Sequence, residues 1–160
     1  MVLRRRFITE RRWKMIKAED LRIGDLVRVS KTGCKIPKGT VCRVTAIETE
    51  SMLFDDRFVS VRLLPIDPKC EQISWYDWCK NISSIPLTPE ILEKNGFKMR
   101  EDTVVYAKNR LGLNPLGDGK GYQVGLGSLR FLFVKVRIIK YVHELQHILW
   151  ALGLDANLKI

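Results

Sequence analysis

Long apolar segments are absent from this sequence of 160 residues. The longest unbroken apolar runs are a few residues, as in Phe131–Val134, whereas a membrane-spanning helix needs about 20. The arginine-rich first residues are not followed by the apolar core of a secretion signal. We therefore expect a protein of the cytoplasm that has no membrane as a partner.

Cysteine is also scarce, and its spacing argues against a structural zinc site. The four cysteines are separated by seven, 27 and eight residues, whereas such sites usually have gaps of about two to four. We expect reduced and partly buried thiols, with disulfide bonds or a zinc site made by these residues as the alternatives. The cysteines are Cys34, Cys42, Cys70 and Cys79.

The composition is that of a globular protein. Hydrophobic residues make up 46% of the chain and charged residues 29%, which excludes an intrinsically disordered protein. A chain of this length usually forms one domain, or one domain with a small appendage. At this size folding buries roughly 68–70% of the surface of the unfolded chain, so the core needs no disulfide or metal to stabilise it.

The net charge of +10 is distributed unevenly along the sequence. Residues 1–14 carry +5 and residues 98–140 carry +6, whereas residues 15–97 are neutral and residues 141–160 carry −1. Concentrated positive charge is typical of a surface that binds phosphate backbones or other polyanions. A solvated tail is the alternative for residues 1–14. Because Met15 resembles a natural start, those residues could also come from an over-long gene prediction.

The first half of the sequence has the pattern of an antiparallel β-barrel. A helical turn over Ala18–Gly24 precedes short strands separated by turn residues, with no room for crossover helices. Leu21–Val29 and Lys38–Ile47 resemble the corresponding parts of a small barrel of the Src-homology-three type, over residues 20–85. Such barrels have many unrelated functions, so the fold alone does not indicate the activity. The expected strands are Leu26–Val29, Thr40–Ile47, Arg57–Leu63 and Ile73–Trp78.

The second half combines helices with further strands, which makes the expected fold class α+β. Thr88 and Pro89 are typical of the start of a helix and Gly96 of its end, so a two-turn helix is predicted with Ile91 and Leu92 inward. Further strands are expected over Thr103–Ala107, Tyr122–Gly127 and Phe131–Ile139, with Val134, Val136 and Ile138 on one face, and a loop over Gly112–Gly121 that turns at Asp118-Gly119.

We accordingly divide the chain into three parts. These are a basic extension over residues 1–14, the small barrel over residues 15–85, and an α+β part over residues 86–160. We expect the third part to pack as one unit with the barrel.

The segment Tyr141–Leu152 predicts a closing amphipathic helix. Its apolar residues repeat at steps of three, four and three, as in a stripe that faces a core. The stripe consists of Val142, Leu145, Leu149 and Leu152.

This helix carries the pattern His-Glu-x-x-His over His143–His147. Histidines four apart on a helix can bind one zinc ion, and the intervening Glu144 can deprotonate a bound water. Both histidines are expected to point away from the stripe, which leaves their nitrogens available. They are, however, the only two histidines of the chain, and Gly153 occupies the place of a third ligand. We favour an ordinary helix surface. The alternatives are a zinc-dependent hydrolase, with His143 and His147 as ligands and Glu144 as general base, or an adventitious or structural metal.

Two further segments have a functional and a structural interpretation. Gly117–Gly121 could offer backbone N–H groups and Lys120 to a phosphate, although a hairpin turn is favoured because the rest of a phosphate-binding loop is missing. Trp75, Tyr76 and Trp78 could form a surface on which bases stack, although packing in or beside the core is favoured.

Three blocks of the sequence, Leu21–Asp25, Ile85–Phe97 and Tyr141–Gln146, occur in an order that resembles one family. It comprises small uncharacterised proteins of Bacteroides-type gut bacteria and their phages or mobile elements. The resemblance begins at about residue 17 and extends to the end of the sequence. It implies a cytoplasmic accessory protein, and it implies that His143–Gln146 is a shared signature of the closing helix. It provides no activity and no functional residue.

The uneven charge leads to our main hypothesis, a non-enzymatic module that binds a polyanion, with nucleic acid as the partner. One alternative is the zinc-dependent hydrolase. Another is a protein-interaction module that acts on a host factor, with Trp75 or Trp78 as anchor. The candidate contacts to nucleic acid are Arg4, Arg5, Arg6, Arg11, Arg12, Lys108, Arg110, Lys120, Arg130, Lys135 and Arg137.

Overall fold

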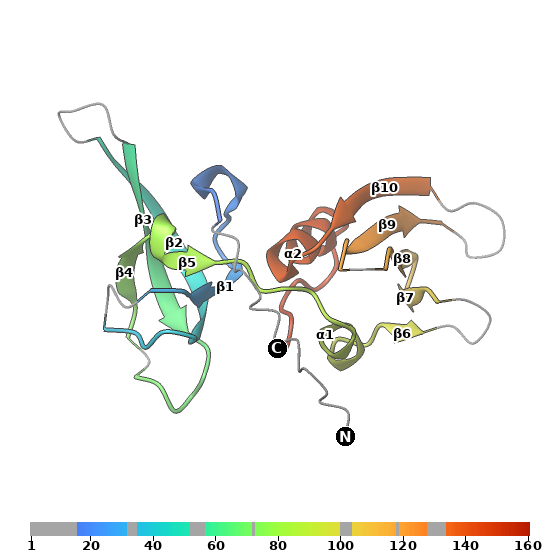
Figure 1. The fold of residues 1–160 in the computed structure, drawn as a ribbon, viewed down its shortest axis with the longest axis horizontal. Helices are drawn as coiled ribbons and strands as arrows, with labels where there is room; N and C mark the ends of the chain where they lie inside the picture. Colours follow the sequence, from blue (N-terminus) through green and yellow to red (C-terminus); the bar gives the residue numbers. More distant parts are fainter. Residues whose placement is uncertain are drawn as a thin grey trace, which may run out of the picture.

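The protein has an α+β fold of two antiparallel sheets, which confirms the expected class (Figure 1). Each sheet has five strands, and the helix α2 (Val142–Ala151) lies between the two sheets. None of the helices in the described part is long and apolar enough to cross a membrane. The computed structural model describes residues 16–31, 35–51, 57–71, 73–99, 104–117, 119–127 and 134–160.

The first sheet has the strand order β4-β3-β2-β1-β5. The four predicted strands are present, although β2 is longer and β4 shorter than expected. The edge strands β4 and β5 are connected directly by a short 3-10 helix, η2, and the described strands do not close into a barrel. The bounds are η1 Ala18–Asp20, β1 Leu26–Val29, β2 Val41–Ser51, β3 Arg57–Pro65, β4 Trp75–Trp78, η2 Cys79–Asn81 and β5 Ile82–Ser83.

Alternating side chains of the first sheet form its core. Val27 and Val29 of β1 pack with residues of β2 and β3 and with Cys79 of η2. Cys42 and Cys79 are buried and Cys70 is half-buried, and no disulfide joins any two of these three cysteines. Cys34 lies outside the described residues.

The second sheet is a simple meander, β10-β9-β8-β7-β6. The prediction of a loop over Gly112–Gly121 is wrong for residues 112–115, because Leu111–Pro115 forms the strand β8. Leu111 and Leu113 alternate into the core, and Gly112 lies opposite Gly125 of β9. The other bounds are β6 Lys98–Met99, β7 Tyr106–Lys108, β9 Tyr122–Leu126 and β10 Val134–Ile139.

A β-bulge changes the register of β10. The shift occurs between Lys135 and Arg137, so Arg137 lies opposite Val124. Val136 and Ile138 are about half exposed, whereas Ile139 is buried. The expectation that Val134, Val136 and Ile138 share one face is therefore wrong, because the bulge places Val134 opposite Leu126 and Ile138 opposite Gln123. Residues 131–133 of the predicted strand lie outside the described residues.

The helix α1 (Pro89–Lys94) begins and ends as predicted. The Thr88 hydroxyl accepts a hydrogen bond from the backbone N–H of Ile91 at 3.4 Å, and Gly96 has the positive φ of +80° that suits glycine at a helix end. Ile91 and Leu92 are buried. The helix therefore forms where its local signals predicted.

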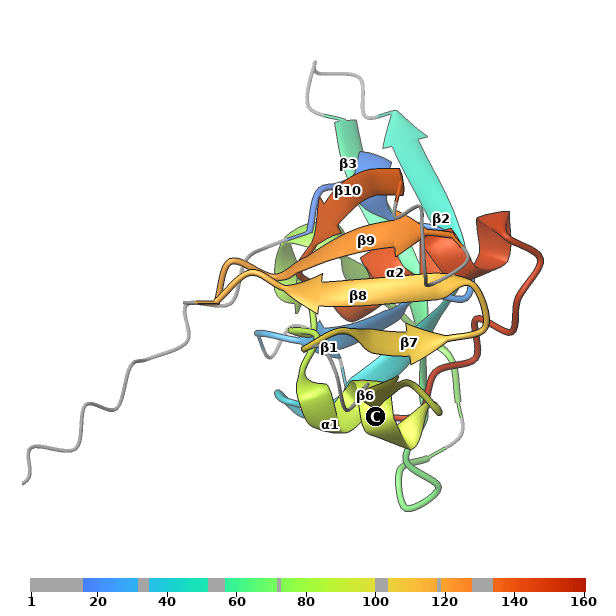
Figure 2. The same cartoon turned by 90° about the vertical axis from the view of Figure 1, so that its right-hand side faces the viewer.

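The helix α2 packs against both sheets. Val142, Leu145 and Leu149 are fully buried in a core that also contains Leu26 of β1 and the inner residues of β7, β8 and β9. Leu152, expected in the same stripe, lies just beyond the helix and is 40% exposed. Figure 2 shows α2 behind the second sheet, whose other face has no described helix or strand over it.

Candidate functional site

The three blocks of the family resemblance lie side by side around α2. The backbone N–H of Val142 donates to the carbonyl of Ile85 at 2.9 Å, and the N–H of Leu87 donates to the carbonyl of Lys140 at 2.9 Å. Leu21–Asp25 reaches the same helix through Asp25. The three blocks therefore meet at α2, whose surroundings form the candidate site.

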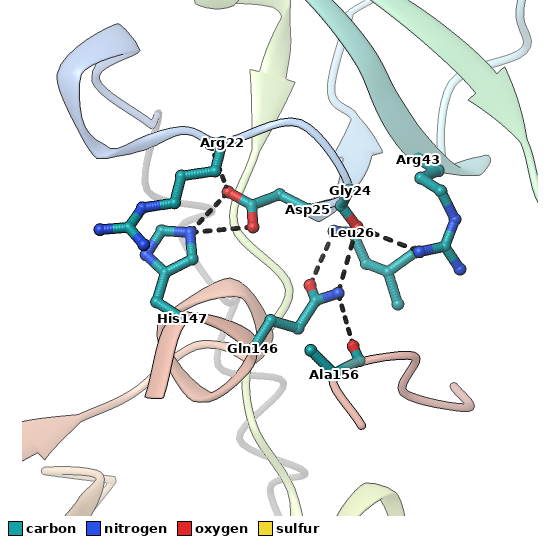
Figure 3. A network of polar contacts seen from close by, with 8 residues as sticks. All are labelled: Arg22, Gly24, Asp25, Leu26, Arg43, Gln146, His147 and Ala156. Carbon is teal, nitrogen blue, oxygen red and sulfur yellow. Dashed lines mark hydrogen bonds and ion pairs between the residues drawn. The ribbon is translucent and has the colours of Figure 1, made fainter. Parts of the chain in front are cut away.

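Asp25 is the centre of a polar network between the first sheet and α2 (Figure 3). A turn at Gly24, with φ of +99°, directs the chain back so that Asp25 accepts a hydrogen bond from the backbone N–H of Arg22 at 2.8 Å. Both Asp25 carboxylate oxygens lie 2.9 Å from Nε2 of His147 on α2. Only 2% of Asp25 is exposed, so its carboxylate is held away from water.

Gln146 connects the start of β1 with the segment that follows α2 (Figure 3). Its Oε1 accepts a hydrogen bond from the backbone N–H of Leu26 at 2.8 Å. Its Nε2 donates to the carbonyl of Gly24 at 3.2 Å and to that of Ala156 at 3.1 Å. Arg43 of β2 also donates to the Gly24 carbonyl, at 3.2 Å. The buried amide thus connects the start of β1, α2 and the segment after α2.

His143 is buried, which corrects the expectation that both histidines point away from the core. It is 4% exposed, its ring is stacked on Tyr141, and its Nδ1 has no hydrogen-bond partner among the described residues. The ring centroids of His143 and His147 are 5.8 Å apart. Burial lowers the pKa of His143 below its usual value, although the negative charges of Asp25 and Glu144 act in the opposite direction.

Acidic pH should therefore destabilise the fold through His143. In the unfolded chain a histidine binds a proton near its ordinary pKa of about 6.5, whereas the buried ring resists protonation until a lower pH. The unfolded state binds more protons in that window, so the free energy of unfolding should fall as the pH drops below about 6.5. Urea denaturation at several pH values measures this slope. His143→Phe should flatten it, and an unchanged slope in that variant would contradict the assignment.

Glu144 helps to start α2. Its Oε2 accepts hydrogen bonds from the backbone N–H groups of Lys140 at 2.6 Å and Tyr141 at 3.0 Å. Its Oε1 lies 3.6 Å from a guanidinium nitrogen of Arg137. Within the described ranges, no group of three or more histidine, cysteine, aspartate or glutamate side chains could hold a metal ion. A hydrolase of the His-Glu-x-x-His type would need Glu144 and His147 to give up these contacts.

Two pockets open on either side of the Asp25–His147 pair. The larger has a volume of about 490 Å³ and lies between the segment before β1, α2 and residues 154–157. The smaller, about 230 Å³, is lined by η1, Tyr141, His143 and Glu144. Arg22 and His147 line both pockets. The polar network therefore separates two spaces that could accept a small ligand.

The candidate cations are placed differently from one another. Arg110 and Lys120 are exposed in the turns of the second sheet. Lys108 is half-buried and donates to the carbonyl of Asn95 at 2.9 Å, and Arg137 pairs with Glu144. The structure brings these four to one sheet without forming a single cluster. Arg4, Arg5, Arg6, Arg11, Arg12, Arg130 and the side chain of Lys135 lie outside the described residues.

The other sequence candidates have structural contacts. The backbone N–H of Leu116 donates to the carbonyl of Gly121 at 3.0 Å, so Gly117–Gly121 connects β8 and β9 as a hairpin, although Asp118 itself is not described. Trp75 is partly buried against the first core, and Lys35 lies 4.6 Å from its ring centroid. Tyr76 is exposed, and its hydroxyl accepts a hydrogen bond from the guanidinium group of Arg62.

Sequence reasoning missed the side chains that form the network and its pockets. Asp25 and Gln146 were part of the resembling blocks, but neither was assigned a contact. Arg43 and Trp150 had no signal that distinguishes them from ordinary surface residues.

Comparisons of the chain with protein-family models, with curated proteins and with solved structures find no match.

Proposed function

We propose that this protein is a non-enzymatic module that binds a polyanion, with nucleic acid as the partner and the second sheet as the binding surface. The observation that carries the proposal is the charge of residues 98–140, which contain nine basic and three acidic residues. Seven of these basic residues lie in the described ranges: Lys98, Lys108, Arg110, Lys120, Lys135, Arg137 and Lys140.

Several of these cations are available to a ligand. Lys98, Arg110, Lys120 and Lys140 are exposed, and none of them has an ion pair with a carboxylate of the described residues. Phosphate groups of nucleic acid pair with such side chains and release counterions, so binding is strong at low salt and weakens as salt is added.

A cross-strand row of the second sheet begins and ends with lysine. It runs from Lys98 through Ala107, Gly112 and Gly125 to position 135. Gly112 and Gly125 are buried, so we assign the contacts with phosphate groups to the ends of the row and to the turns of the sheet. No described helix or strand covers this face (Figure 2).

Reversal of two charges in the turns of the sheet tests the proposal. Arg110→Glu combined with Lys120→Glu should weaken binding of a labelled oligonucleotide by at least about tenfold at moderate salt. It should also reduce the slope of log affinity against log salt by about two. Fluorescence anisotropy with single-stranded and double-stranded probes measures both quantities.

The matched control places the same charge change on the first half of the chain. Lys38→Glu combined with Lys69→Glu alters two exposed lysines outside the second sheet. This variant should keep most of the affinity and of the salt slope. If both variants lost the same oligonucleotide affinity, net charge alone and not the second sheet would explain binding. If the wild-type protein did not bind the oligonucleotide at low salt, the proposal would be rejected.

We make two further proposals, one on the arrangement of the first sheet and one on the origin of the protein. We infer a Src-homology-three type of arrangement for the first sheet, and the return of β5 beside β1 through η2 supports it. We also propose a cytoplasmic accessory protein of the Bacteroides-type mobile-element family, supported by the three blocks that meet at α2. A gene neighbourhood outside any phage or mobile element would count against that origin.

A further inference from the structure

The larger pocket has the size and the fixed walls of a small-molecule site. Its volume of about 490 Å³ lies within the range of about 300–1,000 Å³ that such sites occupy. The walls come from Arg22–Asp25, Arg43, the second half of α2 and Leu154–Asn157. Gln146 accepts a hydrogen bond from Leu26 and donates to Gly24 and Ala156, which connects three of these walls, so the pocket is preformed.

An exposed aromatic ring and an exposed aliphatic side chain face this pocket. Ile23 and Trp150 are 70% and 69% exposed, the highest values among the large hydrophobic side chains that the structure describes. Both line the pocket. An indole ring in this position offers a flat surface on which another planar ring can stack.

Two arginines supply positive charge to the same space. The guanidinium carbon of Arg22 lies 5.4 Å from the ring centroid of Trp150. Arg43 lies on the other side of Gly24 (Figure 3), and among the described residues its Nη1 donates to the neutral oxygens of Gly24 and Asn157. Neither arginine has an ion pair with a carboxylate of the described chain. Guanidinium groups are well suited to phosphate because their planar donors match its oxygens.

The Asp25 carboxylate also lines this pocket but already has partners. It is 2% exposed and occupied by the backbone N–H of Arg22 and by His147. Asp155 is exposed, and its Oδ1 accepts a hydrogen bond from the backbone N–H of Asn157 at 2.9 Å. The pocket thus offers a ligand an indole ring, two guanidinium groups and an apolar edge, beside the carboxylates of Asp25 and Asp155.

We propose that this pocket binds a nucleoside monophosphate or an equivalent heteroaromatic phosphate. Its ring stacks on Trp150, and its phosphate pairs with Arg22. Arg43 adds a second positive group along the pocket. The site shares no residue with the proposed nucleic-acid surface of the second sheet, so the two proposals stand or fall separately.

Calorimetric titration of the full chain with AMP and UMP tests the pocket. Trp150→Ala should weaken binding by about tenfold or more, the effect of removing one ring from a base stack. Arg22→Gln should weaken AMP binding but leave adenosine binding unchanged. The indole N–H signal of Trp150 in the NMR spectrum should shift on addition of AMP, which locates the ligand.

Matched variants elsewhere keep the test specific. Arg62 stacks on exposed Tyr76 in the first sheet, as Arg22 stacks on Trp150, so Tyr76→Ala and Arg62→Gln should leave AMP affinity unchanged. Arg110→Glu with Lys120→Glu should also leave it unchanged, even if that variant loses oligonucleotide binding. Lack of AMP and UMP binding at millimolar concentration would overturn the proposal. Equal AMP affinity of the wild type and of Trp150→Ala would overturn it as well. The same holds if inorganic phosphate binds as tightly as AMP.

Discussion

Replacement of Gln146 by leucine should lower the free energy of unfolding by about 3 kcal/mol. Leucine has a similar size but cannot accept the hydrogen bond from the backbone N–H of Leu26, and that buried group would lose its partner. The donations to the carbonyls of Gly24 and Ala156 would be lost as well. For a chain of this length the midpoint of thermal unfolding should fall by about 6–12 °C, which calorimetry measures.

Gln123→Leu is the matched control for this loss. Gln123 is half-buried on β9 and donates to the carbonyls of Val124 and Arg137, but no buried backbone N–H depends on it. Its replacement should cost less than about 1 kcal/mol. If Gln146→Leu and Gln123→Leu lowered the free energy of unfolding equally, the buried hydrogen bonds of Gln146 would not stabilise the fold more than those of half-buried Gln123.

Gly121→Ala should destabilise the second sheet by about 3–5 kcal/mol. Gly121 has a φ of +97°, which is unfavourable for alanine, and a methyl group there would overlap the backbone carbonyl oxygen of Ile139. That oxygen belongs to the end of β10, which is paired with β9 and cannot move without breaking the ladder. Urea denaturation gives the loss in the free energy of unfolding.

Gly119→Ala separates the two causes of this effect. Gly119 lies in the same hairpin and has a φ of +69°, but a methyl group would meet no atom within 4 Å. Only the backbone cost remains, so the expected loss is about 1 kcal/mol. A loss at Gly121 no larger than the loss at Gly119 would show that overlap with the Ile139 carbonyl adds no cost.

Elements with local signals could be predicted from the sequence. The helix α1 is specified by Thr88, Pro89 and Gly96, which act within their own turns and need no information about the rest of the chain. The strand β8 was missed because Gly112 and Pro115 disfavour a strand locally. Pairing with β7 and β9 and the burial of Leu111 and Leu113 outweigh that preference.

The candidate site could be predicted only in part. A helix with one apolar stripe is expected to expose its other side, but α2 lies between two sheets, so His143 and Gln146 are buried as well. The partner of His147 is Asp25, 122 positions earlier, and no local pattern indicates such a pair. The positive charge of the second sheet was visible in the sequence, whereas the pocket beside Trp150 depends on segments that only the fold brings together.

The position of Gln146 also affects the order in which the protein can fold during synthesis. The amide that accepts the hydrogen bond from Leu26 is added to the chain 120 residues later. At roughly 5–20 residues per second, a ribosome needs about 6–24 s to make that stretch. Throughout that interval the nascent first sheet has no α2 to cover Leu26. We therefore expect a chaperone that recognises exposed apolar segments to bind the nascent first sheet until α2 has been synthesised.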